Sequence, residues 1–184
     1  MPLRPVLQFP DPRLKRKSVP VGEIIDEIRA LALDVIEVIY DEPGIGLAAP
    51  QIGEAIRLVV MDTGWNEEGG EKQPVVMVNP ELLDRDCTLT WTEGCLSVPD
   101  FSAEVERAAR VRVRYRDLDG NEHEEDASEL RAVCFQHEID HLDGVLFIDR
   151  ISRLKRSLYV KRRKKALERE REEEPGAAKT GQAL

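Results

Sequence analysis

The spacing of apolar residues predicts a long amphipathic helix near the start of the chain. Between Glu23 and Tyr40 the apolar side chains recur at steps of three and four residues, which places them on one helix face. Pro43 and Gly44 follow directly and predict that the helix ends before them. We therefore expect this segment to pack one face on a hydrophobic core.

Strands are predicted by the apolar segments that come next. Three short β-prone runs follow one another: Arg57–Met61, Pro74–Val78 and Cys87–Trp91. Glycines and the turn signal Asn79-Pro80 separate these runs. From residue 109 to 116 apolar side chains alternate with arginines, so one face of this strand should be buried and the other exposed. Asp119-Gly120 then predicts a hairpin turn.

Two more helices are predicted in the last third of the chain. Ser128 is a suitable N-cap for the first of them, and Gly144 is a suitable end. One face of this helix collects five side chains: Leu130, Val133, Cys134, His137 and His141. The other helical stretch runs from about residue 149 to 173, and it begins amphipathic and becomes almost wholly charged.

The pattern H-E-x-x-H, formed by residues 137–141, predicts a metal site on the first of these helices. A four-residue step places His137 and His141 one turn apart on the same face, where both rings can bind one ion. Glu138 points elsewhere and can accept a proton from a water that the ion has acidified. The alternative is a structural histidine pair beside a surface glutamate. Because the two histidines share the inward face, a metal that satisfies both is the favoured interpretation.

A catalytic metal site needs a third protein ligand. His123 lies in a polar run after the predicted turn, so we expect it to be a solvated strand residue. Cys95 is the better candidate, because Gly94 allows a close approach and a thiolate binds borderline metals well. Taken alone, Cys95 is better explained as an ordinary buried thiol, which is how we interpret Cys87 and Cys134.

These elements predict an α+β fold, with mainly antiparallel sheets packed around a central metal-binding helix and a C-terminal helix. The chain of 184 residues is long enough to bury one sizeable core. We expect a single domain over residues 1–165, followed by a charged helix end and a disordered tail over residues 166–184.

Composition and charge limit the functions to consider. The formal net charge of -9 argues against a general nucleic-acid binder, and no specific DNA partner is expected. The chain has neither a signal-peptide core in its first thirty residues nor an apolar run of membrane-spanning length. Its three cysteines form no disulfide framework, which indicates reduced thiols or metal ligands. We expect a cytoplasmic protein without a membrane partner.

The segment Gly44–Gln51 is small and apolar until its last residue. Its glycines and alanines allow the backbone to approach a neighbour or a bound substrate closely. Gln51 adds a side-chain NH₂ donor. Taken alone, the segment predicts packing and substrate binding equally well.

Three segments together resemble the peptide deformylase family. Members carry the motifs GφGLAAxQ, EGCφS and QHExDH in this order, where φ is apolar, and all three stand intact here: Gly44–Gln51, Glu93–Ser97 and Gln136–His141. The resemblance covers about residues 5 to 150 and includes the flanking segments 10–14, 79–81 and 144–147. The motifs depend on order and spacing, so they are far more specific than H-E-x-x-H alone.

The resemblance implies removal of the formyl group from the N-terminal formyl-methionine of nascent bacterial polypeptides, which releases formate and a free amine. It implies that Cys95, His137 and His141 hold one divalent metal ion. In the family that ion is Fe²⁺ in the cell, and zinc, nickel or cobalt are also accepted. Glu138 would act as the general base on a water and then deliver the proton to the leaving amine.

The resemblance also implies roles for the residues around the metal. The Gln51 side chain and the Leu96 backbone N–H would stabilise the oxyanion, and the Gly46 backbone would pair with the peptide like a strand. Six further residues would form or adjoin the methionine pocket: Ile45, Trp91, Glu93, Leu130, Val133 and Cys134. The loop Trp65–Gln73 departs from the family pattern, and we expect it to be peripheral.

A basic stretch between Arg153 and Lys165, followed by acidic residues up to Glu174, goes beyond that pattern as well. One interpretation is a solvated helix with internal charge pairing. The other is docking on the ribosome through phosphate contacts.

Two other functions compete with the deformylase prediction. A zinc endopeptidase would share H-E-x-x-H but would take a third ligand other than Cys95. A non-catalytic binding module with a structural metal would bind the ion through protein ligands alone and leave Gln51 without a role.

Overall fold

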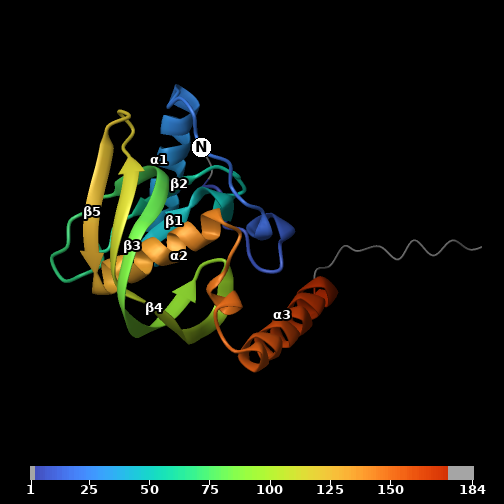
Figure 1. Ribbon diagram of the computed structural model, residues 1–184. Helices are drawn as coiled ribbons and strands as arrows, with labels where there is room; N and C mark the ends of the chain where they lie inside the picture. Colours follow the sequence, from blue (N-terminus) through green and yellow to red (C-terminus); the bar gives the residue numbers. More distant parts are fainter. Residues whose placement is uncertain (1–2, 174–184) are drawn as a thin grey trace, which may run out of the picture. The chain divides into compact units, whose positions relative to one another are not determined.

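The computed structural model describes residues 3–173 and is drawn in Figure 1. The chain divides into two compact units, Met1–Arg150 and Ile151–Leu184. The predicted disordered tail after Glu174 lies outside the described residues, and the domain division at residue 165 stays a prediction. No helix in the described part of the chain has the length and apolar character needed to cross a membrane.

The first unit contains five strands, two α-helices and three short 3₁₀ helices. In chain order they are η1 (Pro12–Lys15), α1 (Asp26–Asp41), β1 (Gly46–Ala48), η2 (Ala49–Ile52), β2 (Leu58–Met61), β3 (Val75–Cys95), β4 (Val98–Arg116), β5 (Glu122–Ser128), α2 (Glu129–Leu142) and η3 (Phe147–Asp149). The described part of the second unit is α3 (Arg153–Glu173). The prediction of an α+β fold with mainly antiparallel strands is confirmed.

One antiparallel sheet, in the order β1-β2-β3-β4-β5, forms the framework of the first unit. The long hairpin of β3 and β4 closes with Cys95 opposite Val98, so Leu96 and Ser97 form its turn. The predicted turn at Asp119-Gly120 joins β4 to β5, and Gly120 adopts a φ of 85° there. Cys95 is therefore placed at the end of a hairpin, where its side chain is held by the sheet.

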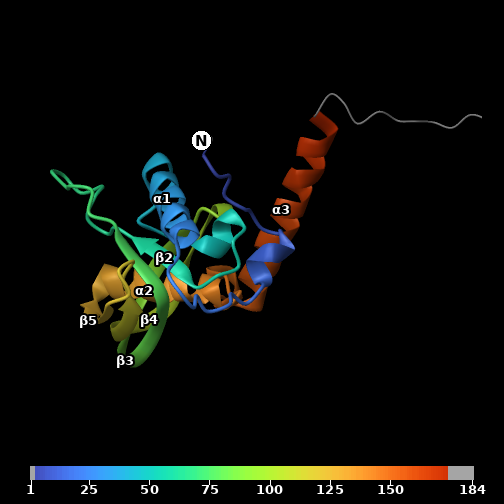
Figure 2. The same ribbon diagram turned by 90° about the horizontal axis from the view of Figure 1, so that it is seen from above.

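Helices α1 and α2 cover opposite faces of the sheet. Successive side chains of β2 alternate between two cores, because neighbouring residues in a strand point to opposite faces. Leu58 and Val60 pack with α1, whereas Val59 and Met61 pack with α2. Figure 2 shows α1 and α2 on the two sides of β2. This layering buries α2, the helix that carries H-E-x-x-H.

The predicted turn at Asn79-Pro80 is wrong. β3 runs through these residues without a break, and the pairing with β4 only shifts register between Val78 and Glu81. Asn79 adopts a φ of 52°, and its side-chain amide exchanges hydrogen bonds of 2.8 and 2.7 Å with the backbone of Val21. A β-bulge at this point accommodates the positive φ of Asn79 within the strand. From the sequence alone, the Asn-Pro pair indicated a turn.

One predicted helix cap and one predicted helix start need correction. Ser128 precedes α2 but makes no capping hydrogen bond, because it is still the last residue of β5 and pairs with Arg110. The third helix begins at Arg153 rather than near residue 149, since the preceding residues form the 3₁₀ helix η3. Gly144, with a φ of 72°, follows the end of α2 as predicted.

Candidate metal centre and substrate pocket

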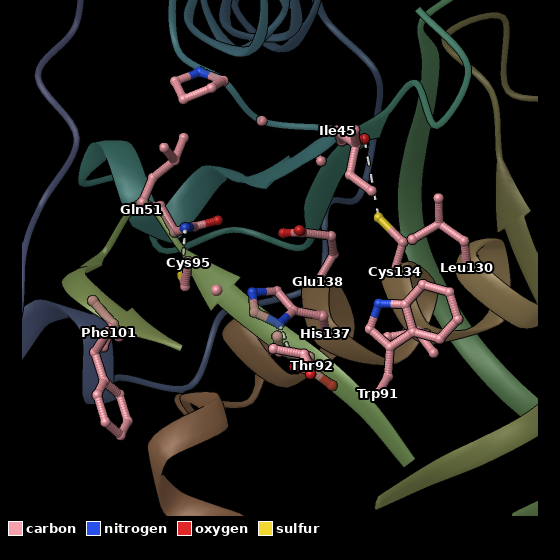
Figure 3. Close-up of a pocket in the computed structure, with 18 of the residues that line it drawn as sticks. Ile45, Gln51, Trp91, Thr92, Cys95, Phe101, Leu130, Cys134, His137 and Glu138 are labelled. Carbon is pink, nitrogen blue, oxygen red and sulfur yellow. Dashed lines mark hydrogen bonds and ion pairs between the residues drawn. The ribbon is translucent and has the colours of Figure 1, made fainter. Parts of the chain in front are cut away.

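The structure brings Cys95 of β3 together with His137 and His141 of α2. The Sγ atom of Cys95 lies 3.3 Å from Nε2 of His141, and the two histidine Nε2 atoms are 3.2 Å apart. All three atoms lie within 4.8 Å of one another. Figure 3 shows Cys95 and His137 on the same side of the cavity, below Gln51.

These three atoms fit the ligand set of a divalent metal ion. Tetrahedral bonds to nitrogen and sulfur leave ligand atoms roughly 3.3–3.8 Å apart, close to the separations found here. Three electron-rich atoms at this range repel one another unless they share a cation. Burial, the main cause, lowers the pKa of His141 and favours the neutral form that binds metals.

His123 does not take part in this centre. It lies in β5, where its exposed ring contacts the Asp117 carboxylate at 2.7 Å. The prediction of a solvated strand residue is confirmed.

Glu93 holds the ring of His137 through the ring nitrogen that faces away from the other ligand atoms. Its carboxylate contacts Nδ1 of His137 at 2.8 Å, which leaves Nε2 directed at the other ligand atoms. Arg107 donates two hydrogen bonds to the same carboxylate, of 2.6 and 2.9 Å. Burial alone would raise the pKa of Glu93, but the hydrogen bonds from Arg107 and His137 outweigh it and lower the pKa to about 2. Glu93 lines the cavity as predicted, yet its two oxygens are already engaged.

Arg107 extends this support to a second carboxylate. Its guanidinium also donates to Asp140 at 2.6 Å, and Arg150 binds Asp140 through both of its oxygens. We call Glu93, Arg107 and Asp140 the buried network; Arg150, whose side chain is 41% exposed, binds Asp140 from the surface. Arg107 was absent from the predicted site, although the alternation over residues 109–116, continued backwards, would have placed it on the inner face of β4.

Glu138 faces the cavity from α2. Figure 3 shows its carboxylate directed between Gln51 and Cys134. Burial raises its pKa to about 7, and Oε2 has no hydrogen-bond partner among the described residues. A Cβ added at Gly46 would lie 2.7 Å from Oε1, so only glycine leaves room for the carboxylate. The group is poised near neutral pH, as proton transfer requires.

The Gln51 amide is fixed beside Cys95. Its oxygen accepts a hydrogen bond from the Ala48 backbone at 2.9 Å. Its nitrogen donates to Ser97 Oγ at 3.1 Å and lies 3.6 Å from Cys95 Sγ. The predictions did not assign a role to Ser97, which is fully buried and sets the direction of this amide.

A cavity of about 420 Å³ opens beside these groups. All the residues predicted for the methionine pocket line it: Ile45, Trp91, Glu93, Leu130, Val133 and Cys134. Gly46 and Leu96 line it too. In Figure 3 Trp91, Leu130 and Cys134 lie on one side of Glu138, and Gln51 and Cys95 lie on the other. Burial raises the pKa of Cys134, so this residue stays a thiol and adds to the apolar wall.

The loop between β2 and β3 contacts the wall of the cavity without lining it. The Trp65 indole donates a hydrogen bond of 2.8 Å to the carbonyl oxygen of Gly44, which lines the cavity. Nothing in the sequence indicated this contact, because its two residues lie far apart along the chain.

Comparison with known proteins agrees with this geometry. The sequence model of the family described as polypeptide deformylase matches residues 3–157. The chain belongs to the polypeptide deformylase family. A peptide deformylase from Rhodopseudomonas palustris is 52% identical over 170 residues, which cover 92% of this chain and 97% of the relative.

Solved structures of deformylases have the same fold. The peptide deformylase from Legionella pneumophila superposes with a TM-score of 0.84 at 39% identity, over 94% of this chain and 99% of the other. The enzyme from Ehrlichia chaffeensis in complex with actinonin gives a TM-score of 0.83 at 36% identity, over 90% and 98% of the two chains.

Family membership establishes the activity at the level of the family. The chain is a hydrolase and a metalloenzyme that removes the N-terminal formyl group from nascent peptides. The endopeptidase and the non-catalytic module are set aside, since neither is compatible with membership in this family.

Proposed function

We propose that Cys95, His137 and His141 bind the catalytic metal ion of this deformylase. The observation that carries the proposal is the convergence of three ligand atoms, all within 4.8 Å, at one end of an apolar cavity. A divalent cation bound there would acidify a water molecule and polarise the formyl oxygen. We propose Fe²⁺ as the ion in the cell, and this mixed sulfur and nitrogen ligand set also suits Zn²⁺, Ni²⁺ and Co²⁺.

Glu138 moves the proton in the proposed reaction. Its carboxylate, with a pKa raised to about 7 by burial, accepts a proton from the attacking water. It then delivers the proton to the nitrogen of the leaving peptide as the bond between the formyl carbon and nitrogen breaks. The products are formate and a free amino terminus.

The oxyanion that develops on the formyl oxygen receives hydrogen bonds from the Gln51 side chain and the Leu96 backbone N–H. Gln51 is suited to this role because Ala48 holds its oxygen, which leaves its NH₂ group directed at Ser97 and Cys95. Such fixed donors need no reorganisation during the reaction, and loss of one typically costs about 100- to 1,000-fold in rate.

The apolar part of the cavity takes the methionine side chain, and the edge of β1 at Gly46 pairs with the peptide backbone. An unbranched thioether suits a slot lined by Ile45, Leu130 and Val133. Trp91 and Cys134 complete this slot, and Glu93 acts through His137. Actinonin, the ligand named for the Ehrlichia chaffeensis relative, should occupy the same cavity.

Formate release from a formyl-methionyl tripeptide tests these roles. Metal-assayed parent protein prepared without oxygen should turn over, whereas Glu138→Gln should keep its metal and lose at least about 100-fold in kcat. The matched control is Glu106→Gln, a change at an exposed position of β4, which should behave like the parent. Full activity of Glu138→Gln would remove Glu138 from the mechanism.

For α3 we propose contact with the ribosome, as befits a cytoplasmic enzyme that acts on nascent chains. The helix carries consecutive basic residues from Lys161 to Lys165, which suit phosphate contacts. Pairing within the helix is the competing role, and Arg163 does pair with Glu170 at 3.2 Å. Salt-sensitive pelleting with ribosomes, lost when Lys161, Lys164 and Lys165 become glutamine, would support contact. Equal pelleting of the two proteins would refute it.

A further inference from the structure

We propose that Trp65 is a positioning residue that holds the peptide-binding wall of the cavity, Gly44–Gly46, in place for the substrate. This inference rests on the proposed function, because it assigns the wall to peptide binding. It concerns a loop that lies outside the three motifs of the site.

The peptide-binding wall extends from the end of β1, where the regular pairing of β1 with β2 stops. The ladder between β1 and β2 closes with Gly46 opposite Met61. One residue further, the Asp62 backbone N–H donates to the carbonyl oxygen of Ile45 at 2.9 Å. The next carbonyl, that of Gly44, accepts from the Trp65 indole at 2.8 Å. The indole therefore anchors a carbonyl that lies beyond the last backbone hydrogen bond to the β2 side.

Trp65 is itself held by a buried anchor. Its ring packs edge-on against Tyr40, with centroids 5.3 Å apart and planes at 83°. The Tyr40 hydroxyl donates to the Asp62 carboxylate at 2.6 Å, and the Gln73 backbone N–H donates to the same carboxylate at 2.7 Å. Asp62 is only 5% exposed. One carboxylate therefore ties the beginning of the loop to its end and to α1.

The wall needs such support because two of its three residues are glycines, which lose the most backbone freedom on ordering. Gly46 cannot become a stiffer residue, since a Cβ there would lie 2.7 Å from Glu138 Oε1. At position 44 a Cβ would make a close contact of 3.4 Å with Leu96 Cδ1. With glycine at both positions, the Trp65 hydrogen bond supplies restraint that the backbone of the wall lacks.

Kinetics of Trp65→Phe test the inference, because phenylalanine keeps an aromatic ring and removes only the indole donor. A single lost hydrogen bond should raise KM for a formyl-methionyl tripeptide about 3- to 10-fold. The value of kcat and the bound metal should stay within about twofold of the parent, since no ligand and no proton carrier is touched. The matched control is Lys72→Met, which removes the contact of Lys72 with the Tyr40 ring but leaves the indole in place.

Hydrogen exchange of the backbone amides of residues 44–47 provides a readout that does not need turnover. Exchange should be faster in Trp65→Phe than in the parent and unchanged in Lys72→Met. Parent-like exchange and KM in Trp65→Phe, or an equal rise in both variants, would overturn the inference. A parent that holds metal and releases no formate would refute the proposed function instead, and the exchange result would still decide whether Trp65 holds the wall.

Discussion

Strand β4 carries arginine–carboxylate pairs in two opposite surroundings. Arg107 lies on its inner face, where its side chain is 2% exposed and that of its partner Glu93 is 3% exposed. Arg112 lies on the outer face and pairs with Asp126, with exposed fractions of 51% and 71%. The closest nitrogen–oxygen distances are 2.6 and 2.8 Å, so the two pairs differ in environment rather than in geometry.

The environment decides what each pair does. Arg110, Arg112 and Arg114 all pair with carboxylates of the neighbouring strands, and we call these pairs the exposed ladder. Water screens the exposed ladder, so its pairs contribute little to stability. In the buried network no water replaces a missing partner, and breaking a pair leaves an uncompensated charge. The buried network also ends on His137, which gives it a second role in orienting a metal ligand.

Of the variants that test this comparison, Arg107→Leu should lose the most stability. It leaves the carboxylates of Glu93 and Asp140 buried without the cation that they share. We expect the free energy of unfolding to fall by about 3–5 kcal/mol, measured by urea unfolding of metal-free protein. Arg112→Leu is the matched control, and an equal loss there would show that burial does not distinguish the two sets.

Low pH should also distinguish the buried network from the exposed ladder, because it should destabilise the buried network more. Because the pKa of Glu93 falls from 4.5 to about 2 on folding, its contribution is complete above 4.5 and is lost as the pH drops from there toward 2. A shift of this size corresponds to at most about 3 kcal/mol. Between about pH 5 and about pH 3 the metal-free parent should therefore lose stability more steeply than Glu93→Gln. Parallel curves for the two proteins would contradict this assignment.

Metal affinity should fall when the buried network is changed and should stay the same when the exposed ladder is changed. Glu93→Gln removes the charge that holds Nδ1 of His137, and we expect binding to weaken about 10- to 100-fold. Competition with a chelator for Zn²⁺ measures the change. Asp126→Asn, which removes a charge from the exposed ladder, should bind the metal as tightly as the parent; a comparable loss would mean that net charge, rather than contact with His137, is responsible.

The smallest effect is expected for Arg112→Gln. Both Arg112 and Asp126 are open to solvent, so their pairing competes with hydration and salt. The unfolding midpoint, the metal affinity and the rate of formate release should all match the parent within error. A clear loss in any of them would show that the exposed ladder is coupled to the site.

The elements of the fold were predictable to different degrees. The helix that carries H-E-x-x-H follows from local spacing, since a four-residue step fixes which side chains share a face. The alternation over residues 109–116 likewise identified the buried face of β4. The bulge at Asn79 and the unbroken length of β3 were not predictable, because the partner that stabilises Asn79 is the distant backbone of Val21.

The predicted site shows the same limit. The motifs identified the groups that converge on the cavity. They include Ser97 without showing its contact with Gln51, and they leave out Arg107 and Trp65. Each of these three makes its contact across a long stretch of chain. The strand alternation places Arg107 on an inner face, but no local pattern shows which distant group any of these three side chains contacts.

The sequence alone was enough to identify the residue types of the proposed metal site, the two histidines on one helix face, and the family. These depend only on residue identity and on spacings of a few residues. Long-range packing was needed to show that β3 brings Cys95 to α2, and that Arg107 meets Glu93 and Asp140 there. Burial is a property of the packed layers. An arginine–carboxylate pair therefore contacts His137, a proposed metal ligand, on one face of β4, whereas a pair of the same chemistry on the other face is solvated.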